Sequence, residues 1–484
     1  MGAFPTTIVI IFRRITLTLT TILVRQWLFQ RLGAISMPRR WWQWVILLVL
    51  VWEWGQATVP RLLPSDALLG SFDAFWWAGH CVVSGRDIYS PPPNTTERNV
   101  YPPFHAILMA PIALLPKKVA FFLWQVGQLV VLAFCFWLME RMGEFSVSQR
   151  EGRIWLSLLL VLPFLEHNFV WAQYNHWLLL GLLGFLSLLN RRRFLESGCL
   201  LGFIVSLKPF HLPLVLFWLI LKREWRIILA FLISAGTFTF LLPACVWGWQ
   251  GAWSLLMRWH DKVAPNAFCV TEPCGGLPST LFRLLTPANV SLEPEKPLTV
   301  NFLTLPTSLV SVIVMLLAAL LIALIISECR QPLAMTNGLR ALYEMALVLT
   351  VSLLLSPRTE KHHCLLLLPA TFLIADRWMT KDGRKVLCFP IGAVAMIFIL
   401  RQSLPRSWRE WLRIPYWWHA AVMVSYLVAL LMAKPLEQSA QKGQQNDAGS
   451  DDSACDDGSD GGGVGANRSH PTEMDGGRTG GVHP

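Results

Sequence analysis

The stretch SFDAFWWAGH, residues 71–80, places a carboxylate, Asp73, immediately before an aromatic trio. A positioned carboxylate can act as a general base and take a proton from an acceptor hydroxyl. Aspartate is equally a residue that caps helices. The rings of Trp76 and Trp77 can stack on sugars, although tryptophan is also a common anchor at a membrane boundary. Asp73 is therefore a candidate catalytic base, and the two tryptophans are candidate substrate contacts.

Two further stretches place polar side chains beside apolar runs. YPPFH supplies Tyr101 and His105, and its prolines block a helix and direct the loop back toward the membrane. WAQYNHW supplies Gln173 and Asn175, whose amides either cap helices or bind substrate hydroxyls. All four side chains are candidate substrate-binding residues, with loop geometry and capping as the alternatives.

Several cations are candidate ligands for a phosphate. Lys208 lies within an apolar run and precedes a proline; a charge in such a place is costly and indicates function unless it snorkels to the headgroups. In GGLPSTLFRLL, Ser279 and Arg283 lie at a predicted helix start, where anions bind, or form a simple cap with a solvated arginine.

The stretch SPRTEKHH adds Arg358, His362 and His363. Adjacent histidines on a helix point about 100° apart, so we expect phosphate or hydroxyl contacts and no shared metal. An interfacial charge cluster is the alternative. No P-loop, GxGxxG or DxD motif occurs in the sequence. We therefore expect neither a metal nor a cofactor.

The elements that position these residues follow from composition. The chain has 484 residues, of which 54% are hydrophobic and 15% are charged, whereas soluble domains have roughly 25% charged residues. Apolar runs of about 20 residues cross a bilayer as helices. We predict an all-α polytopic membrane protein of about 12 transmembrane helices. The predicted spans are 43–60, 118–140, 154–171, 176–190, 194–207, 210–221, 225–249, 305–327, 341–356, 363–376, 385–401 and 416–433.

Basic residues predict the orientation, because they cluster in alternate loops and favour the cytoplasmic side. The remaining segments are predicted from composition. Residues 1–42 form a basic cytoplasmic or interfacial segment, 43–433 the membrane domain, and 434–484 a disordered acidic tail rich in Gly, Asp and Ser. The run 104–116 is too short to cross, so the first outer loop is re-entrant or interfacial. The loop 402–415 resembles an interfacial helix.

This topology gathers the candidate residues at the outer face. The same topology places Cys269 and Cys274 in one outer polar loop, where an oxidising compartment permits a disulfide. The net charge of +11 does not indicate nucleic-acid binding, because the basic residues follow the membrane pattern and no nucleic-acid motif occurs.

The order and spacing of these motifs resemble glycosyltransferase family 87, polytopic enzymes of the GT-C type. Two positions depart from the family pattern: Ala172 replaces a glycine before Gln173, and Leu277-Pro278 stand where Asn-Gln often precedes the serine. The resemblance rests on Asp73 with residues 75–77, Gly85 to Tyr89, Tyr101 to Pro103 running to Pro116, Gln173 with Asn175, Lys208-Pro209, Ser279 with Arg283, and Ser356-Pro357 with His362-His363.

The resemblance implies a GT-C-like helical bundle in the plasma membrane with an extracytoplasmic active site. It implies transfer of a mannose-like hexose or an arabinose-like pentose from a polyprenyl-phosphate donor to a glycan or lipid acceptor. Asp73 would be the base, and Lys208, Arg283, Arg358 and the histidine pair would meet the donor phosphate. The main alternative is a transporter or flippase for a lipid-linked or sugar substrate. A glycan ligase or polymerase and a non-catalytic scaffold are further alternatives.

Overall fold

The computed structural model describes residues 40–64, 67–93, 99–143, 145–209, 212–263, 268–271, 274–291, 298–333, 337–403 and 414–434. The predicted N-terminal segment up to residue 39, most of the predicted interfacial helix 402–415, and the tail from residue 435 lie outside these ranges. The chain divides into two units, 1–434 and 435–484, and all of the described residues belong to the first.

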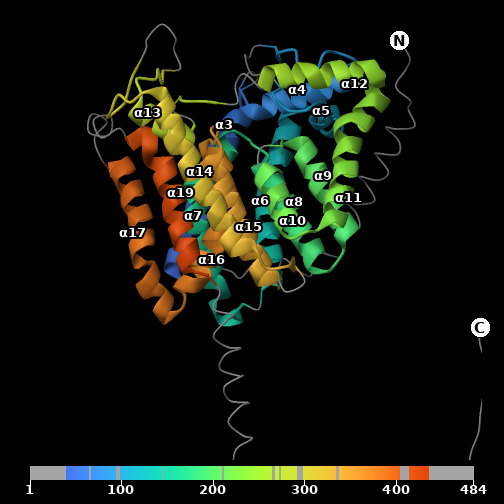
Figure 1. Cartoon of the computed structure of the whole chain (residues 1–484). Helices are drawn as coiled ribbons and strands as arrows, with labels where there is room; N and C mark the ends of the chain where they lie inside the picture. The colour runs from blue at the N-terminus through green and yellow to red at the C-terminus, as the bar shows by residue number, and fades with distance from the viewer. Residues whose placement is uncertain are drawn as a thin grey trace, which may run out of the picture. The chain divides into compact units, whose positions relative to one another are not determined.

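The described residues fold into helices and form no β-strand (Figure 1). The elements are α3 (Trp41–Leu62), α4 (Ser71–Ser84), α5 (Pro103–Met109), η3 (Ile112–Leu114), α6 (Lys117–Met142), η4 (Val147–Gln149), α7 (Arg150–Val170), α8 (Asn175–Asn190), α9 (Phe194–Leu207), α10 (Leu212–Leu221), α11 (Trp225–Gly236), η6 (Thr237–Leu241), α12 (Leu242–Val263), α13 (Leu277–Leu285), α14 (Thr307–Cys329), α15 (Gly338–Leu355), η9 (Lys361–Leu367), α16 (Leu368–Trp378), α17 (Lys381–Ser403) and α19 (Ile414–Met432).

Six stretches of helix among the described residues are long and apolar enough to cross a membrane. They correspond to α3, α6, α7 with η4, the run from α11 to α12, α14 and α15. The helices α8 and α9 and residues 417–432 are apolar but shorter. The prediction of an all-helical polytopic membrane protein is confirmed, and each predicted span overlaps a helix.

The helices differ in what they pack against. In α15, 89% of the apolar window is buried, whereas in α14 the figure is only 11%. A helix that is apolar all round and exposed is suited to lipid, while a buried one forms the centre of a bundle. The helix α15 is therefore the core of the described bundle, and α14 presents its side chains to the bilayer.

Small residues let two of the shorter helices approach closely. A Cβ on Gly198 would lie 2.5 Å from the carbonyl oxygen of Ile227, and one on Gly202 would lie 2.7 Å from the backbone nitrogen of Ala235. Both glycines are on one face of α9, four residues apart, in the small-xxx-small spacing of membrane helix pairs. This spacing explains why α9 and α11 pack so tightly.

The segment predicted as the first outer loop contains two helices, one of which, α5, overlaps the predicted short apolar run 104–116. They are α4 and α5, and the C-terminal part of α12 crosses over them at one end of the bundle (Figure 1). Arg258 of α12 forms an ion pair with Asp87 at 2.7 Å, and the indole of Trp259 donates to the carbonyl of Val100 at 3.1 Å. A kink at Gly248, where φ is +74°, redirects α12 across this end.

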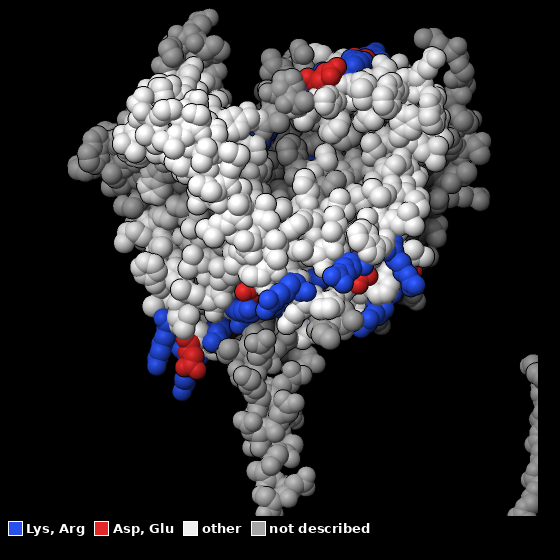
Figure 2. All heavy atoms as spheres, viewed as in Figure 1, with Lys and Arg blue, Asp and Glu red and all other residues white. Residues whose placement is uncertain are grey.

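The two ends of the bundle differ in charge. Lys and Arg side chains gather along one end, which holds Arg191–Arg193 between α8 and α9 and Arg223 between α10 and α11 (Figure 2). We call it the basic end. The opposite end, where α7 and α9 finish and α4 and α8 begin, is called the site end. The surface is hollowed there between α14 and α12 (Figure 2).

Candidate active site

The break between α9 and α10 presents a buried lysine. Lys208 follows the last residue of α9, and only 3% of it is exposed. Its ammonium donates to Oδ1 of Asn175 at 3.0 Å and lies 5.5 Å from the centroid of the Tyr174 ring. Burial lowers the pKa of Lys208 to about 7; the charge of Glu360 opposes this shift, and that of Arg358 adds to it.

An amide pair joins this lysine to a segment far along the chain. The side-chain nitrogen of Asn175 donates to the carbonyl of His362 at 3.1 Å and to Oδ1 of Asn168 at 3.0 Å. Asn168, near the end of α7, donates to the same His362 carbonyl at 2.8 Å. The starts of α8 and η9 are thereby held together, with the Asn175 side-chain oxygen left to receive Lys208.

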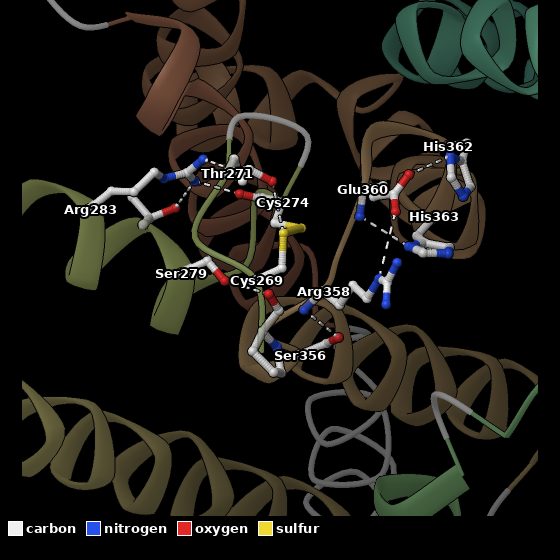
Figure 3. The surroundings of a disulfide bond; sticks show 12 residues. Cys269, Thr271, Cys274, Ser279, Arg283, Ser356, Arg358, Glu360, His362 and His363 are labelled. Atoms are coloured by element: carbon white, nitrogen blue, oxygen red, sulfur yellow. Dashed lines mark hydrogen bonds and ion pairs between the residues drawn. A yellow bond between two sulfur atoms is a disulfide. The ribbon is translucent and has the colours of Figure 1, made fainter. Parts of the chain in front are cut away.

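The turn before η9 carries Arg358, and the first turn of η9 carries His362 and His363 (Figure 3). Glu360 lies between them: its carboxylate is 4.0 Å from the Arg358 guanidinium and 3.5 Å from Nδ1 of His362. The backbone N–H of Glu360 donates to Nδ1 of His363 at 3.0 Å. Burial lowers the pKa of His362, and the charge of Lys208 adds to this shift. His362 is therefore neutral at physiological pH.

Aromatic rings surround His105 at the start of α5. Its ring stacks on Tyr174 with centroids 5.3 Å apart, and the rings of Tyr101 and Phe75 lie at 4.8 and 5.0 Å. Neither of its ring nitrogens has a hydrogen-bond partner among the described residues. Burial and the charge of Lys208 lower the pKa of His105 to about 3. The ring is thus a neutral member of an aromatic wall beside the lysine.

Gln173 connects this wall to the helix that carries Asp73. The hydroxyl of Tyr101 donates to Oε1 of Gln173 at 3.2 Å, and Nε2 of Gln173 donates to Oγ of Ser71 at 2.8 Å. Ser71 is the first residue of α4, two positions before Asp73. The predicted amide contacts are therefore with protein groups, and they hold α4 next to the aromatic wall.

Asp73 lies in the first turn of α4 and is 1% exposed. Its Oδ2 accepts from the backbone N–H of Leu69 at 2.6 Å, and its Oδ1 forms an ion pair with Lys117 at the start of α6. The side chain of Lys117 is 39% exposed. The carboxylate is thus held in place by one backbone donor and by one cation that faces solvent.

The two tryptophans after Asp73 pack against neighbouring loops. The indole of Trp76 donates to the carbonyl of Leu115 at 3.2 Å, and that of Trp77 donates to Oγ of Ser90 at 3.3 Å. The ring of Trp76 also stacks on His80, with centroids 5.2 Å apart. These contacts orient both rings while leaving each partly exposed.

Ser279 and Arg283 lie on α13, on the other side of the Arg358 turn (Figure 3). The hydroxyl of Ser279 donates to the carbonyl of Pro357. The guanidinium of Arg283 is 1% exposed and donates to the carbonyl of Thr271 at 2.7 Å and to that of Cys274. Both side chains therefore bind backbone carbonyls of the segments that lie next to Arg358 and Glu360.

The structure brings most of the predicted residues into two adjoining groups. The charge of Lys208 acts on His362, and that of Arg358 acts on Lys208; Asn175 hydrogen-bonds both Lys208 and the His362 carbonyl. The other group is the aromatic wall, joined to Asp73 through Gln173. Neighbours of the candidate residues that the sequence analysis did not name are Lys117, Asn168 and Tyr174. Proline before Lys117 and the WAQYNHW motif around Tyr174 were signals for two of them, whereas Asn168 lies inside an apolar run.

Comparison with known proteins identifies the family. The model of glycosyltransferase family 87 matches residues 99–357, more than half of the chain. The chain belongs to glycosyltransferase family 87. It is therefore a membrane glycosyltransferase, as the order of motifs predicted. No solved structure matches the chain.

Two mycobacterial relatives are similar to it. A polyprenol-phosphate-mannose-dependent alpha-(1-2)-phosphatidylinositol mannoside mannosyltransferase of Mycobacterium tuberculosis is 24% identical over 373 residues, which cover 72% of this chain and 81% of the relative. A polyprenol-phosphate-mannose-dependent alpha-(1-2)-phosphatidylinositol pentamannoside mannosyltransferase of Mycolicibacterium smegmatis is 32% identical over 108 residues. That match spans 22% of this chain and about a quarter of the relative.

One departure from the family pattern acquires a physical meaning in the structure. Ala172, which stands where the family has glycine, adopts φ of +48°. This left-handed conformation suits glycine and strains a residue with a Cβ. The conformation turns the chain from α7 into α8 and so places Gln173 and Asn175 at the site end. A glycine at this position would adopt the left-handed conformation without strain, whereas Ala172 adopts it with some conformational strain.

Proposed function

We propose that the protein transfers a mannose-like hexose or an arabinose-like pentose from a polyprenyl-phosphate donor to a glycan or lipid acceptor on the extracytoplasmic face. Mannose is favoured, because both relatives depend by name on polyprenol-phosphate-mannose, and their names make a phosphatidylinositol mannoside the first acceptor to test. The observation that carries the proposal is the buried Lys208, held by Asn175 close to Arg358 and the His362 segment.

The proposed donor explains why a cation is buried at this position. A lipid-linked donor enters from the bilayer, so its phosphate meets the protein at a helix end near the headgroups. Lys208 and Arg358 would neutralise that phosphate, and the imidazoles of His362 and His363 would donate to its oxygens. Burying a cation is costly, and an anionic ligand beside it lowers that cost.

The reaction assigns a task to Asp73. An acceptor hydroxyl attacks C1 of the sugar, the bond from C1 to the phosphate oxygen breaks, and the polyprenyl phosphate leaves with the electron pair. Asp73 takes the hydroxyl proton, for which Lys117 must leave its carboxylate; the exposure of Lys117 makes such a movement accessible. The rings of Trp76, Trp77 and Tyr101, with His105 behind them, would face the sugar.

The site end would then be extracytoplasmic. The positive-inside tendency puts the basic end in the cytoplasm, and the disulfide between Cys269 and Cys274 at the site end is a bond typical of an oxidising compartment. We further propose that six further helices, α8, α9, α10, α16, α17 and α19, cross together with the six long stretches, giving about 12 spans in a GT-C-like bundle. In that arrangement α4, α5 and η3 form an interfacial or re-entrant first outer loop.

Sugar transfer by membranes that contain the protein tests this function. Radiolabelled polyprenyl-phosphate mannose is supplied first and a polyprenyl-phosphate arabinose second, and label in lipid and glycan products is counted. Asp73→Asn should reduce transfer by about a hundredfold or more, the usual contribution of a general base. The matched control is Asp261→Asn, an exposed aspartate of α12, which should transfer at the wild-type rate.

Each outcome of the transfer assay supports or excludes a part of the proposal. Label in product with wild type but not with Asp73→Asn supports both the reaction and the base. Equal transfer by the two proteins removes Asp73 from the mechanism. No transfer from either donor by folded protein rules out the proposed donors; donor movement between leaflets in vesicles would then point to a flippase.

A further inference from the structure

The outer loop before α13 is closed by a disulfide between Cys269 and Cys274 (Figure 3). Arg283 of α13 holds the same loop from inside, because its guanidinium donates to the carbonyl of Thr271 at 2.7 Å and to the carbonyl of Cys274. Two devices, one covalent and one a buried forked donor, therefore act together on this one loop. That is more restraint than an outer loop needs simply to connect two helices.

The constrained loop is fastened directly to the turn that precedes η9. Gly275 donates its N–H to the carbonyl of Thr359 at 2.5 Å, and Cys274 forms an antiparallel bridge with Glu360. Gly276 permits the approach, since a Cβ there would clash with the carbonyl oxygen of Ser356. Backbone contacts of this kind fix the path of the turn whatever side chains it carries.

The α13 helix makes a second attachment to the same turn. Ser279 donates its hydroxyl to the carbonyl of Pro357. The turn therefore receives contacts from the loop on one side and from the helix on the other. Its side chains, Arg358 and Glu360, and the following His362 share the electrostatic environment of Lys208. A shift of the turn would move these groups away from the place proposed for the donor phosphate.

We propose that the disulfide loop and α13 form a clamp that positions the Arg358–His362 segment, with Arg283 and Ser279 as positioning residues. The clamp consists of residues 269–271 and 274–276 together with those two side chains. Arg283 then acts through the carbonyls it holds and has no contact with the donor. The proposal rests on the proposed function in one respect, that the clamped segment meets the donor phosphate.

Hydrogen exchange of the purified protein tests the clamp without any substrate. The variants are Cys269→Ser with Cys274→Ser, and Arg283→Gln. Each should raise amide exchange of the peptide covering residues 356–363 at least tenfold while exchange in α15 is unchanged. Unaltered exchange in that peptide would overturn the clamp. The matched control is Cys199→Ser, an exposed free cysteine of α9, which should leave the peptide unchanged.

A double-mutant cycle on donor kinetics distinguishes positioning from direct phosphate contact. If Arg283 acts through the loop, the KM for the donor should rise about tenfold in the double cysteine variant and about tenfold in Arg283→Gln. The KM should rise no further when all three substitutions are combined, because each variant removes the same restraint. Multiplied effects would show that Arg283 acts on the donor by itself and would overturn its positioning role. Ser279→Ala, a milder change in the same clamp, should raise KM two- to threefold and serves if Arg283→Gln does not fold.

The two proposals fail in different ways. If the exchange result is as expected but no lipid donor is used, the clamp stands and the proposed donor does not. If transfer is observed with wild type while both variants keep wild-type exchange and KM, the glycosyltransferase reaction stands and the clamp does not.

Discussion

Buried cations lie at both ends of the bundle, but their partners differ in kind. At the basic end, Lys222 forms an ion pair with Glu344 at 2.6 Å, and both side chains are fully buried. Arg340 reaches the same carboxylate at 3.2 Å. At the site end, the ammonium of Lys208 donates to the neutral amide oxygen of Asn175 and lies beside tyrosine rings.

A second network at the basic end also pairs a buried cation with carboxylates. Arg153 donates to both carboxylate oxygens of Glu140 at 3.0 and 2.8 Å and to Asp376 at 2.7 Å, joining α7 to α6 and α16. Removing one partner of a buried ion pair leaves the other uncompensated, so each member of such a network is needed for the fold. A cation held by an amide is instead suited to an anionic ligand. We therefore expect the charges at the basic end to be structural and Lys208 to be functional.

The largest effect on stability is expected when the basic-end network is broken. Glu344→Ala leaves Lys222 and Arg340 without their shared carboxylate, so the free energy of unfolding should fall by about 3–5 kcal/mol. The measurement is the thermal midpoint of the purified protein in detergent. Donor KM of the fraction that remains folded should stay within twofold of wild type.

Glu196→Ala is the matched control for that change. Glu196 forms an exposed ion pair with Arg193 three residues away, of a kind that contributes little to stability because water screens it. Its midpoint should match wild type. An equal drop in both variants would mean that the buried network has no special structural role.

The next effect concerns activity at the site end. Lys208→Met should reduce kcat/KM for the donor about a hundredfold, as the loss of a preorganised electrostatic contact does. The thermal midpoint should be unchanged or higher, because an apolar chain of similar length replaces a buried cation. Lys262→Met, on α12 at the same end, is the control and should retain transfer. A lower midpoint with normal transfer would place Lys208 with the structural charges.

A smaller effect follows from the pKa of Lys208, which burial lowers to about 7. Below pH 7 the ammonium of the empty site is charged; above pH 7 it is neutral, and binding a phosphate requires proton uptake. Donor KM should therefore rise with pH, approaching tenfold per unit between pH 8 and 9. His105, with a pKa of about 3, does not titrate in this range.

Lys208→Arg sharpens the pH experiment. Arginine stays protonated throughout the range, so the rise in KM should disappear even if the overall rate falls. A rise that persists in Lys208→Arg would assign the titration to another group, on the enzyme or on the donor.

The smallest effect is expected from a substitution at the site end that alters stability and leaves sugar transfer unchanged. Ala172→Gly relieves the left-handed conformation at φ +48° and should stabilise the protein by up to about 1 kcal/mol. Calorimetry in detergent should show a modest rise in the midpoint, with transfer at the wild-type rate. A lower midpoint would mean that the added freedom of glycine in the unfolded chain outweighs the strain.

Much of the fold was predictable from sequence because a bilayer demands long apolar helices. The runs 43–60 and 118–140 fall within α3 and α6 for this reason. The helix α4 was not predicted, since its short apolar pattern is interrupted by Asp73 and His80 and is too short to cross. Its helical state depends on packing against α5 and η3.

The sequence by itself determined which residues gather at the site end, since apolar length and loop charge set where each helix begins and ends. Tertiary structure alone decided their partners. Asn175 binds the carbonyl of His362, 187 residues away, and Arg283 binds loop carbonyls where the sequence suggested a phosphate. Such contacts depend on how helices pack sideways, and neither apolar length nor motif order encodes that directly. Hydrogen bonds between distant segments form only once the bundle has assembled.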